Sequence, residues 1–190
     1  MVHVRTVLDI LALVTGLLGT APLFFHLNRI PQFVFLAALV FVIFAAWKGV
    51  PPLRGWRATV TTGVFFIYYA LQFSRDNLVE PAANLLVVLL SIRLAGEKIP
   101  RNYLQIYALS LFALAASSAF SLSGAFLGYL GLLLLSIAVS LVLLTFFTVD
   151  SRLSLTRRGL RRVASVAAAM PAASAPLILL FFVILPRPQF

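Results

Sequence analysis

The sequence predicts an all-α fold: a polytopic bundle of about seven transmembrane helices, with a cytoplasmic N-terminus and an extracytoplasmic C-terminus. Three observations predict it. Hydrophobic residues make up 62% of the 190 residues and charged residues only 11%, whereas a soluble domain is nearer half apolar and a quarter charged. Apolar runs recur along nearly the whole chain, and the mean hydropathy is +1.07. The basic residues lie in the gaps between these runs, as the positive-inside rule requires.

The apolar runs define a single transmembrane domain over residues 1–190 with no soluble domain. The expected spans are residues 6–25, 33–47, 57–73, 81–97, 103–120, 125–148 and 163–186. At 1.5 Å per residue, such segments reach roughly 22–36 Å, which is close to the hydrocarbon thickness of a bilayer. The second and fourth are short and need snorkelling side chains at their ends or local thinning of the bilayer to span it. Residues 26–32, which include Arg29 and Pro31, are expected to form a turn.

The first segment is expected to be an uncleaved helix rather than a signal peptide. Asp9 lies inside its start, and Thr20-Ala21-Pro22 is a poor cleavage site.

The fourth segment is the one around which we expect the bundle to be organised. Pro81 suits the first turn of a helix, where its missing N–H costs nothing. At 100° per residue, Asn84, Ser91 and Ala95 fall on one narrow stripe of an otherwise leucine-rich and valine-rich helix. A helix that is apolar on most sides and has one small, polar stripe belongs inside a bundle.

The fifth and sixth segments are joined by a short turn at residues 121–123 and carry small residues on one face each. The fifth has Ala108, Ala115 and Ala119, and the sixth opens with Gly124, Gly128 and Gly131. Because membrane helices associate through close backbone approach at small residues, we expect these two faces to pack together. The alternative is that Gly and Ala are simply common in membrane helices.

The basic residues determine the expected orientation. With the N-terminus inside, 12 of the 15 Lys and Arg residues face the cytoplasm, and Arg29, Arg75 and Arg187 remain outside. The inner face then holds Arg93, Lys98, Arg101, Arg152, Arg157, Arg158, Arg161 and Arg162. The loop at 150–162 either carries a short interfacial helix on anionic headgroups or acts only as a topology determinant. Because membrane topology accounts for the net charge of +10, we do not expect nucleic-acid binding.

The residue inventory argues against catalysis by this chain. There is no cysteine, so thiol nucleophiles and Cys-ligated metals are excluded. His3 and His26 lie near opposite ends of the first segment, and no metal or nucleophile motif is present. We expect Ser117, Ser118, Ser121 and Ser123 to bond backbone carbonyls, as serine does in membrane helices. No catalytic residue, cofactor or metal site is predicted.

One polar cluster stands out at the expected outer mouth of the bundle, between the third and fourth segments. It consists of Arg75, Asp76, Asn77 and Glu80, with Tyr68, Tyr69 and Gln72 beneath it. The opposite charges can pair, which makes a salt-bridged loop cap one interpretation; such exposed pairs contribute little stability. The other interpretation is a docking surface for an extracytoplasmic partner or domain.

The whole chain resembles the N-terminal membrane domain of the TgpA-type transglutaminase-like proteins of the bacterial inner membrane. The resemblance is carried by the Arg75-Asp76 turn, the following helix, the Arg93…Glu97…Arg101 exit, the arginine-rich loop and the final Leu-Pro-Arg. It implies an extracytoplasmic transglutaminase-like domain with a Cys-His-Asp triad beyond the last helix. Since this chain has no cysteine, no triad residue can be assigned.

Two functional hypotheses follow. In the first, the chain is a multi-pass membrane anchor and scaffold whose partners are the lipid bilayer and a transglutaminase-like domain, in cis or in trans, absent from this chain. In the second, it is a stand-alone integral membrane protein that acts as a transporter or a lipid-binding module. A transporter usually keeps an ionisable group near the bilayer midplane, and the charged residues here lie near the ends of the segments.

Overall fold

The computed structural model describes residues 2–48, 56–72, 79–120 and 124–149, together with residues 154–155, 159, 162–163, 165–166 and 169. The helices are α1 (Val4–Thr20), α2 (Arg29–Lys48), α3 (Trp56–Ala70), α4 (Val79–Ala95), α5 (Pro100–Ser118) and α6 (Gly124–Val149), with a 3₁₀ helix η1 (Phe24–His26) between α1 and α2. Two strands of two residues each, β1 (Val2–His3) and β2 (Ser154–Leu155), pair antiparallel. The predicted all-α class is confirmed.

Six of the seven expected segments correspond to a helix, and the seventh, residues 163–186, lies almost entirely outside the described residues. The prediction of a turn over residues 26–32 is wrong in its second half, since α2 already begins at Arg29. Pro31 falls in the first turn of that helix, where proline breaks no hydrogen bond. The second segment is therefore a 20-residue helix rather than a short one.

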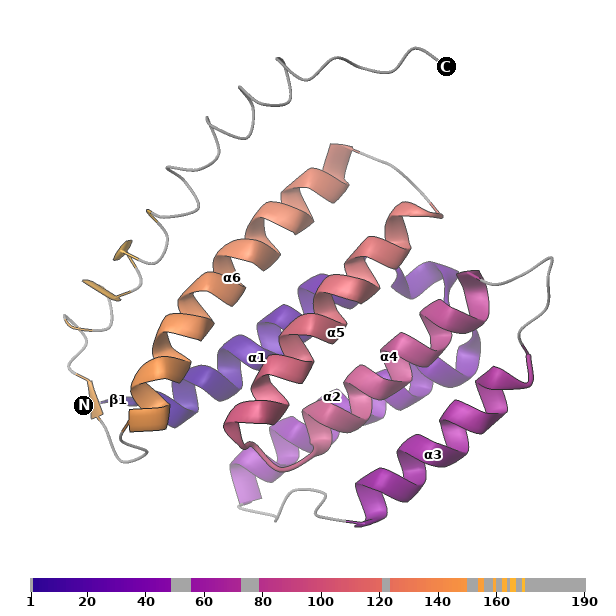
Figure 1. The fold of residues 1–190 in the computed structure, drawn as a ribbon, viewed down its shortest axis with the longest axis horizontal. Helices are drawn as coiled ribbons and strands as arrows, with labels where there is room; N and C mark the ends of the chain where they lie inside the picture. The colour runs from indigo at the N-terminus through magenta and orange to yellow at the C-terminus, as the bar shows by residue number, and fades with distance from the viewer. Residues whose placement is uncertain are drawn as a thin grey trace. The chain divides into compact units, whose positions relative to one another are not determined.

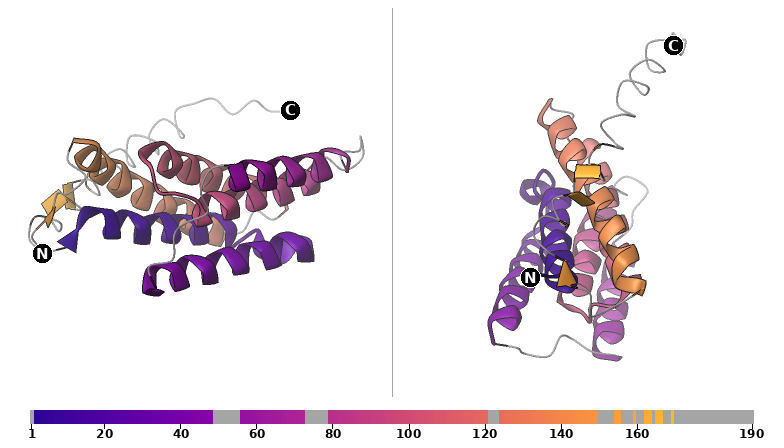
Figure 2. Two further views of the ribbon diagram at one scale, coloured as in Figure 1. Left: turned by 90° about the horizontal axis from the view of Figure 1, so that it is seen from below. Right: turned by 90° about the vertical axis from the view of Figure 1, so that its left-hand side faces the viewer.

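The chain divides into two compact units, one formed by residues 9–133 and one by residues 1–8 with 134–190. In the first unit, α4 packs against α2, α3 and α5. Figure 1 shows α3, α4 and α5 side by side, and Figure 2 shows α2 and residues 9–20 of α1 in a second layer behind them. Ten of the 17 residues of α4 are buried, including Asn84, Ser91 and Ala95. The predicted central helix and its buried stripe are confirmed.

A close crossing in this unit joins α1 to α5. A Cβ atom placed on Gly19 would lie 2.4 Å from the Ser110 carbonyl oxygen, so the two backbones are in direct contact there. One turn earlier, a Cβ on Gly16 would lie 2.9 Å from the Leu94 Cδ1 atom of α4. Small residues do allow helices to approach closely, but the ones that do so here are in α1.

The predicted packing of the small faces of α5 and α6 is wrong. Ala108, Ala115 and Ala119 are exposed on α5, and a Cβ on Gly128 or Gly131 would meet nothing within 4 Å. Gly124 only marks the start of α6. Residues 9–133 include both faces, yet α5 buries the opposite side, with Ile106, Ser110 and Leu114. The small residues on these two faces therefore do not mediate a contact between α5 and α6.

Two helices, over Arg29–Lys48 and Phe126–Thr148, are long and apolar enough to cross a membrane among the residues that the structure describes. In the apolar stretch of each helix, 17% of the residues of the first and 22% of the second are buried among the described residues. Large apolar side chains such as Phe33, Val40 and Trp47 project outward from α2.

Candidate functional site: buried polar groups at both ends of α4

A cluster of three polar side chains lies where α1, α5 and the α4–α5 connection meet. The Tyr103 hydroxyl donates a hydrogen bond of 2.6 Å to Asp9 Oδ1. Tyr103 is fully buried, and Asp9 is half-buried. The Lys98 Nζ atom lies 5.9 Å from the centre of the Tyr103 ring. The phenol thus contacts an acidic group through its hydroxyl and a basic group through its ring, which is a cation–π distance.

The Lys98 ammonium lacks the hydrogen bonding that joins the other two members of this cluster. Its Nζ atom is buried and has no hydrogen-bond partner within the described ranges. Burial lowers the pKa of Lys98, and the negative charge of Asp9 opposes that shift. Burial disfavours the charged form of an amine, so this lysine is not a simple solvated charge.

The backbone before α5 holds Lys98 in this place. Asn102 Nδ2 donates to the Glu97 carbonyl oxygen at 2.6 Å, which fixes the connection against the first turn of α5. Ile99 is extended, with φ −105° and ψ 157°, and Pro100 follows at the start of the helix. The residue before a proline prefers this extended conformation, so the sequence Ile99-Pro100 sets the direction in which the connection enters α5.

A second set of polar contacts lies toward the other end of α4. The Asn28 backbone N–H donates to Asn84 Oδ1 at 3.1 Å, and Gln32 Nε2 donates to the carbonyl oxygens of Phe24 and Leu27 at 2.8 and 3.2 Å. His26 stacks on Phe120, with ring centres 5.2 Å apart. Asn84 is fully buried, and its Nδ2 atom has no hydrogen-bond partner among the described residues. These contacts fasten the α1–α2 connection to α4 and to the end of α5.

The model of the TgpA N-terminal domain matches residues 11–190. The chain belongs to this family. The match covers nearly the whole chain and confirms the resemblance seen in the sequence. No curated protein and no solved structure matches the chain.

Of the outer polar cluster expected in this TgpA N-terminal domain, only Glu80 is described. It lies half-buried in the first turn of α4. Arg75, Asp76 and Asn77 lie outside the residues that the structure describes. Both interpretations of the cluster, the salt-bridged cap and the docking surface, therefore stay predictions.

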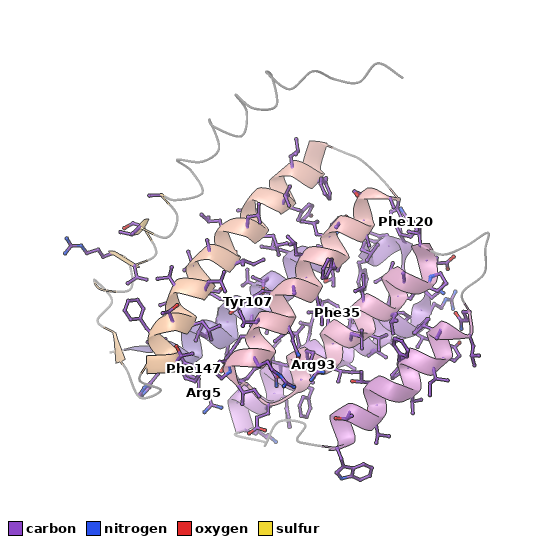
Figure 3. All side chains as sticks on the ribbon, in the orientation of Figure 1. Arg5, Phe35, Arg93, Tyr107, Phe120 and Phe147 are labelled. Carbon is purple, nitrogen blue, oxygen red and sulfur yellow. The ribbon has the colours of Figure 1, made fainter. Side chains whose placement is uncertain are left out.

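The basic residues that the sequence predicts on the inner face differ in their surroundings. Arg93 is half-buried in the last turn of α4, and Figure 3 places it beside the turn into α5, at the opposite end of α5 from Phe120. Arg101 and Arg162 are exposed, and Arg152, Arg157, Arg158 and Arg161 fall in parts of the chain that are not described. Arg93, Lys98 and Arg101 do share one end of the α4–α5 pair.

Serine hydroxyl groups of the TgpA N-terminal domain form hydrogen bonds within their own helices. Ser117 and Ser118 donate to the Leu114 and Ala115 carbonyl oxygens at 2.6 and 2.7 Å, as the sequence predicted, whereas Ser121 and Ser123 are not among the described residues. Ser91 and Ser110 bond their own helices in the same way. Because each hydroxyl is satisfied within its helix, these side chains can be buried at helix contacts at little cost.

The cluster of Asp9, Tyr103 and Lys98 was not predicted from the sequence. Each of the two charges lies near the end of an apolar segment, which is where solvated charges are expected. The available signal was that Asp9 is an acidic residue inside the start of an apolar run. Intramembrane and near-membrane acidic residues commonly have a partner, and here the partner comes from a helix 94 residues away.

Proposed function

We propose that this TgpA N-terminal domain is the multi-pass membrane anchor and scaffold of a transglutaminase-like protein of the bacterial inner membrane. In this proposal seven helices span the bilayer, and the domain presents its outer face to an extracytoplasmic transglutaminase-like domain, in cis or in trans. The chain itself carries out no acyl transfer.

The observation that carries the proposal is the exposed apolar surface of α2 and α6. Both helices reach membrane-spanning length while few of their residues are buried. Trp47, at the end of α2, is 91% exposed. Exposed apolar side chains along a whole helix are costly in water, whereas in lipid they are the expected outer surface of a bundle, with tryptophan at its interfacial edge.

The orientation is tested with reporter fusions at residues 53, 77, 99, 155 and 190. The positive-inside rule predicts cytoplasmic signals at 53, 99 and 155 and extracytoplasmic signals at 77 and 190. A cytoplasmic signal at 77 or 190 would contradict the proposed topology, and complete extraction of the chain by alkaline carbonate would contradict membrane embedding itself.

The scaffold role is tested by reversing charges in the outer polar cluster. In a protein that carries a downstream transglutaminase-like domain, changing Asp76 and Glu80 to Lys should reduce crosslinking of that domain to the membrane part, because complementary charges guide docking. The matched control is reversal of Glu97, which lies just beyond the other end of α4. Crosslinking that survives the double reversal unchanged would leave only a structural cap, and acyl transfer by residues 1–190 alone would overturn the proposal.

One observation favours a second function, lipid binding. An apolar groove of about 340 Å³ lies beside α2 in the unit formed by residues 9–133, and its volume is within the range of small-molecule sites.

A further inference from the structure

The groove is built by three helices around a floor of small residues. α2 and α3 each pack against α4, and the space between them is lined by Ala37 and Phe41 of α2, Thr61 of α3, and Ser91 and Ala95 of α4. The side chains of Ala37, Ser91 and Ala95 are too short to fill the space between larger neighbours. The groove therefore follows directly from the residues at these positions.

The lining favours a hydrocarbon ligand over a polar one. The Ser91 hydroxyl, which is a polar group of the floor, donates to the Val87 carbonyl oxygen of its own helix at 2.7 Å. The walls are formed by Val34, Phe41 and Ile92. Apolar cavities of this kind do not hold water stably, because a buried water needs two to four polar partners.

The two ends of the groove differ. At the Val34 end it meets a buried cluster of Tyr69, Val88 and Ile92, against which Val34 and Phe65 pack. At the Phe41 end, α2 continues for seven residues to Lys48, or roughly 10 Å at 1.5 Å per residue. That distance lies within one leaflet of a hydrocarbon core about 30 Å thick.

The groups beyond the Phe41 end suit a phospholipid headgroup. Trp47 and Trp56 are strongly exposed there, on α2 and α3. The Lys48 ammonium lies 4.9 Å from the centre of the Phe44 ring, so its stem runs along the apolar surface while its charge stays near the helix end. Tryptophan and snorkelling lysine are the residues that mark the interface between hydrocarbon and headgroups.

We propose that this groove binds one acyl chain of an acidic phospholipid from the leaflet on the Lys48 side. The chain enters between α2 and α3 over the floor of α4, and the phosphate pairs with Lys48. This inference rests on the proposed membrane embedding, since only then does the groove open into lipid. In this proposal the phospholipid is a specifically bound ligand of the domain, in addition to the bulk lipid that surrounds it.

The test uses the full chain in nanodiscs of phosphatidylcholine with a small fraction of phosphatidylglycerol that carries a diazirine along one acyl chain. After illumination, labelled residues are mapped by mass spectrometry. We expect the label to concentrate on Phe41, Thr61 and Ala95. Neutral phosphatidylcholine carrying the same diazirine should label these residues less. Equal labelling by the two lipids would overturn the role of Lys48.

Two matched variants test the site itself. Ala37→Phe fills the groove from an exposed position and should lower labelling at Thr61 and Ala95 about tenfold. A loss of this size is expected when roughly two methylene groups of the acyl chain are no longer buried in the groove. Ala46→Phe makes the same change on the opposite face of α2 and should leave labelling unchanged.

Label spread evenly over the outer face of α2, or crosslinks to a second copy of the chain at Thr61, would overturn the acyl-chain site while leaving membrane embedding intact. Absence of any label together with loss from the membrane would instead contradict the proposed function.

Discussion

Replacing Gly19 by alanine is expected to destabilise the unit formed by residues 9–133 more than any other single methyl addition considered. The new Cβ would lie 2.4 Å from the Ser110 carbonyl oxygen and 2.8 Å from the Ser110 Cα atom. Both are backbone atoms, so α1 and α5 must move apart as whole helices. Overpacking of this kind costs about 1–3 kcal/mol, and at roughly 2–4 °C per kcal/mol the midpoint of thermal unfolding in detergent should fall by roughly 2–12 °C.

Two other glycines provide matched controls for the same substitution. Gly16→Ala brings the new methyl to 2.9 Å from Leu94 Cδ1, the end of a flexible side chain that can rotate away, so its effect should be small. Gly128→Ala places the methyl in open space and should be neutral or slightly stabilising, because alanine has the higher helix propensity. If Gly19→Ala unfolds at the same temperature as Gly128→Ala, the close crossing of α1 and α5 does not exist in the folded protein.

The position of α4 at the centre of its unit could be predicted from the sequence. Asn84 and Ser91 are seven residues apart, which is close to two helical turns, so they share a face whatever the helix packs against. In an apolar helix, a polar face of this kind is stable only where it is enclosed or bonded, and both residues are buried in the structure. Periodicity within one helix was sufficient for this prediction.

The partner of a small-residue face could not be predicted in the same way. Gly16 and Gly19 of α1 and Gly128 and Gly131 of α6 have the same spacing, yet only the first pair forms a close helix contact. Spacing shows which residues share a face but not which other helix that face meets. The short connection between α5 and α6 favoured their association, but it constrains only the ends of the two helices, whereas the α1–α5 crossing joins segments about 90 residues apart.

The candidate polar site required tertiary information for the same reason. Asp9, Lys98 and Tyr103 come from three elements, and nothing in the local sequence of Asp9 indicates that it accepts a hydrogen bond from Tyr103. The extended Ile99-Pro100 step was predictable from the proline, but the direction in which it points Lys98 depends on how α4 and α5 pack. Sequence patterns thus identified the elements, and helix packing decided which polar groups meet.

The second large effect is expected at Lys98, where replacement by methionine should stabilise the domain at neutral pH. Methionine has a similar length and no charge to bury, and Lys98 Nζ has no hydrogen-bond partner among the described residues. An unsatisfied buried polar group costs about 1–3 kcal/mol, so the unfolding midpoint should rise by several degrees. The matched control is Lys48→Met, at an exposed lysine whose ammonium lies over the Phe44 ring, which should change the midpoint little.

The pH dependence distinguishes removal of a buried charge from a general gain in packing. Burial lowers the pKa of Lys98 in the folded state, while in the unfolded chain it returns to about 10.4. Between these two pKa values the unfolded state binds more protons, so the stability of the wild-type protein rises with pH across this window. The advantage of Lys98→Met should therefore be largest below the folded-state pKa and shrink as the pH approaches 10. An advantage that stays constant from pH 6 to pH 10 would mean that the Lys98 amine titrates normally and is not buried as a charge beside Asp9 and Tyr103.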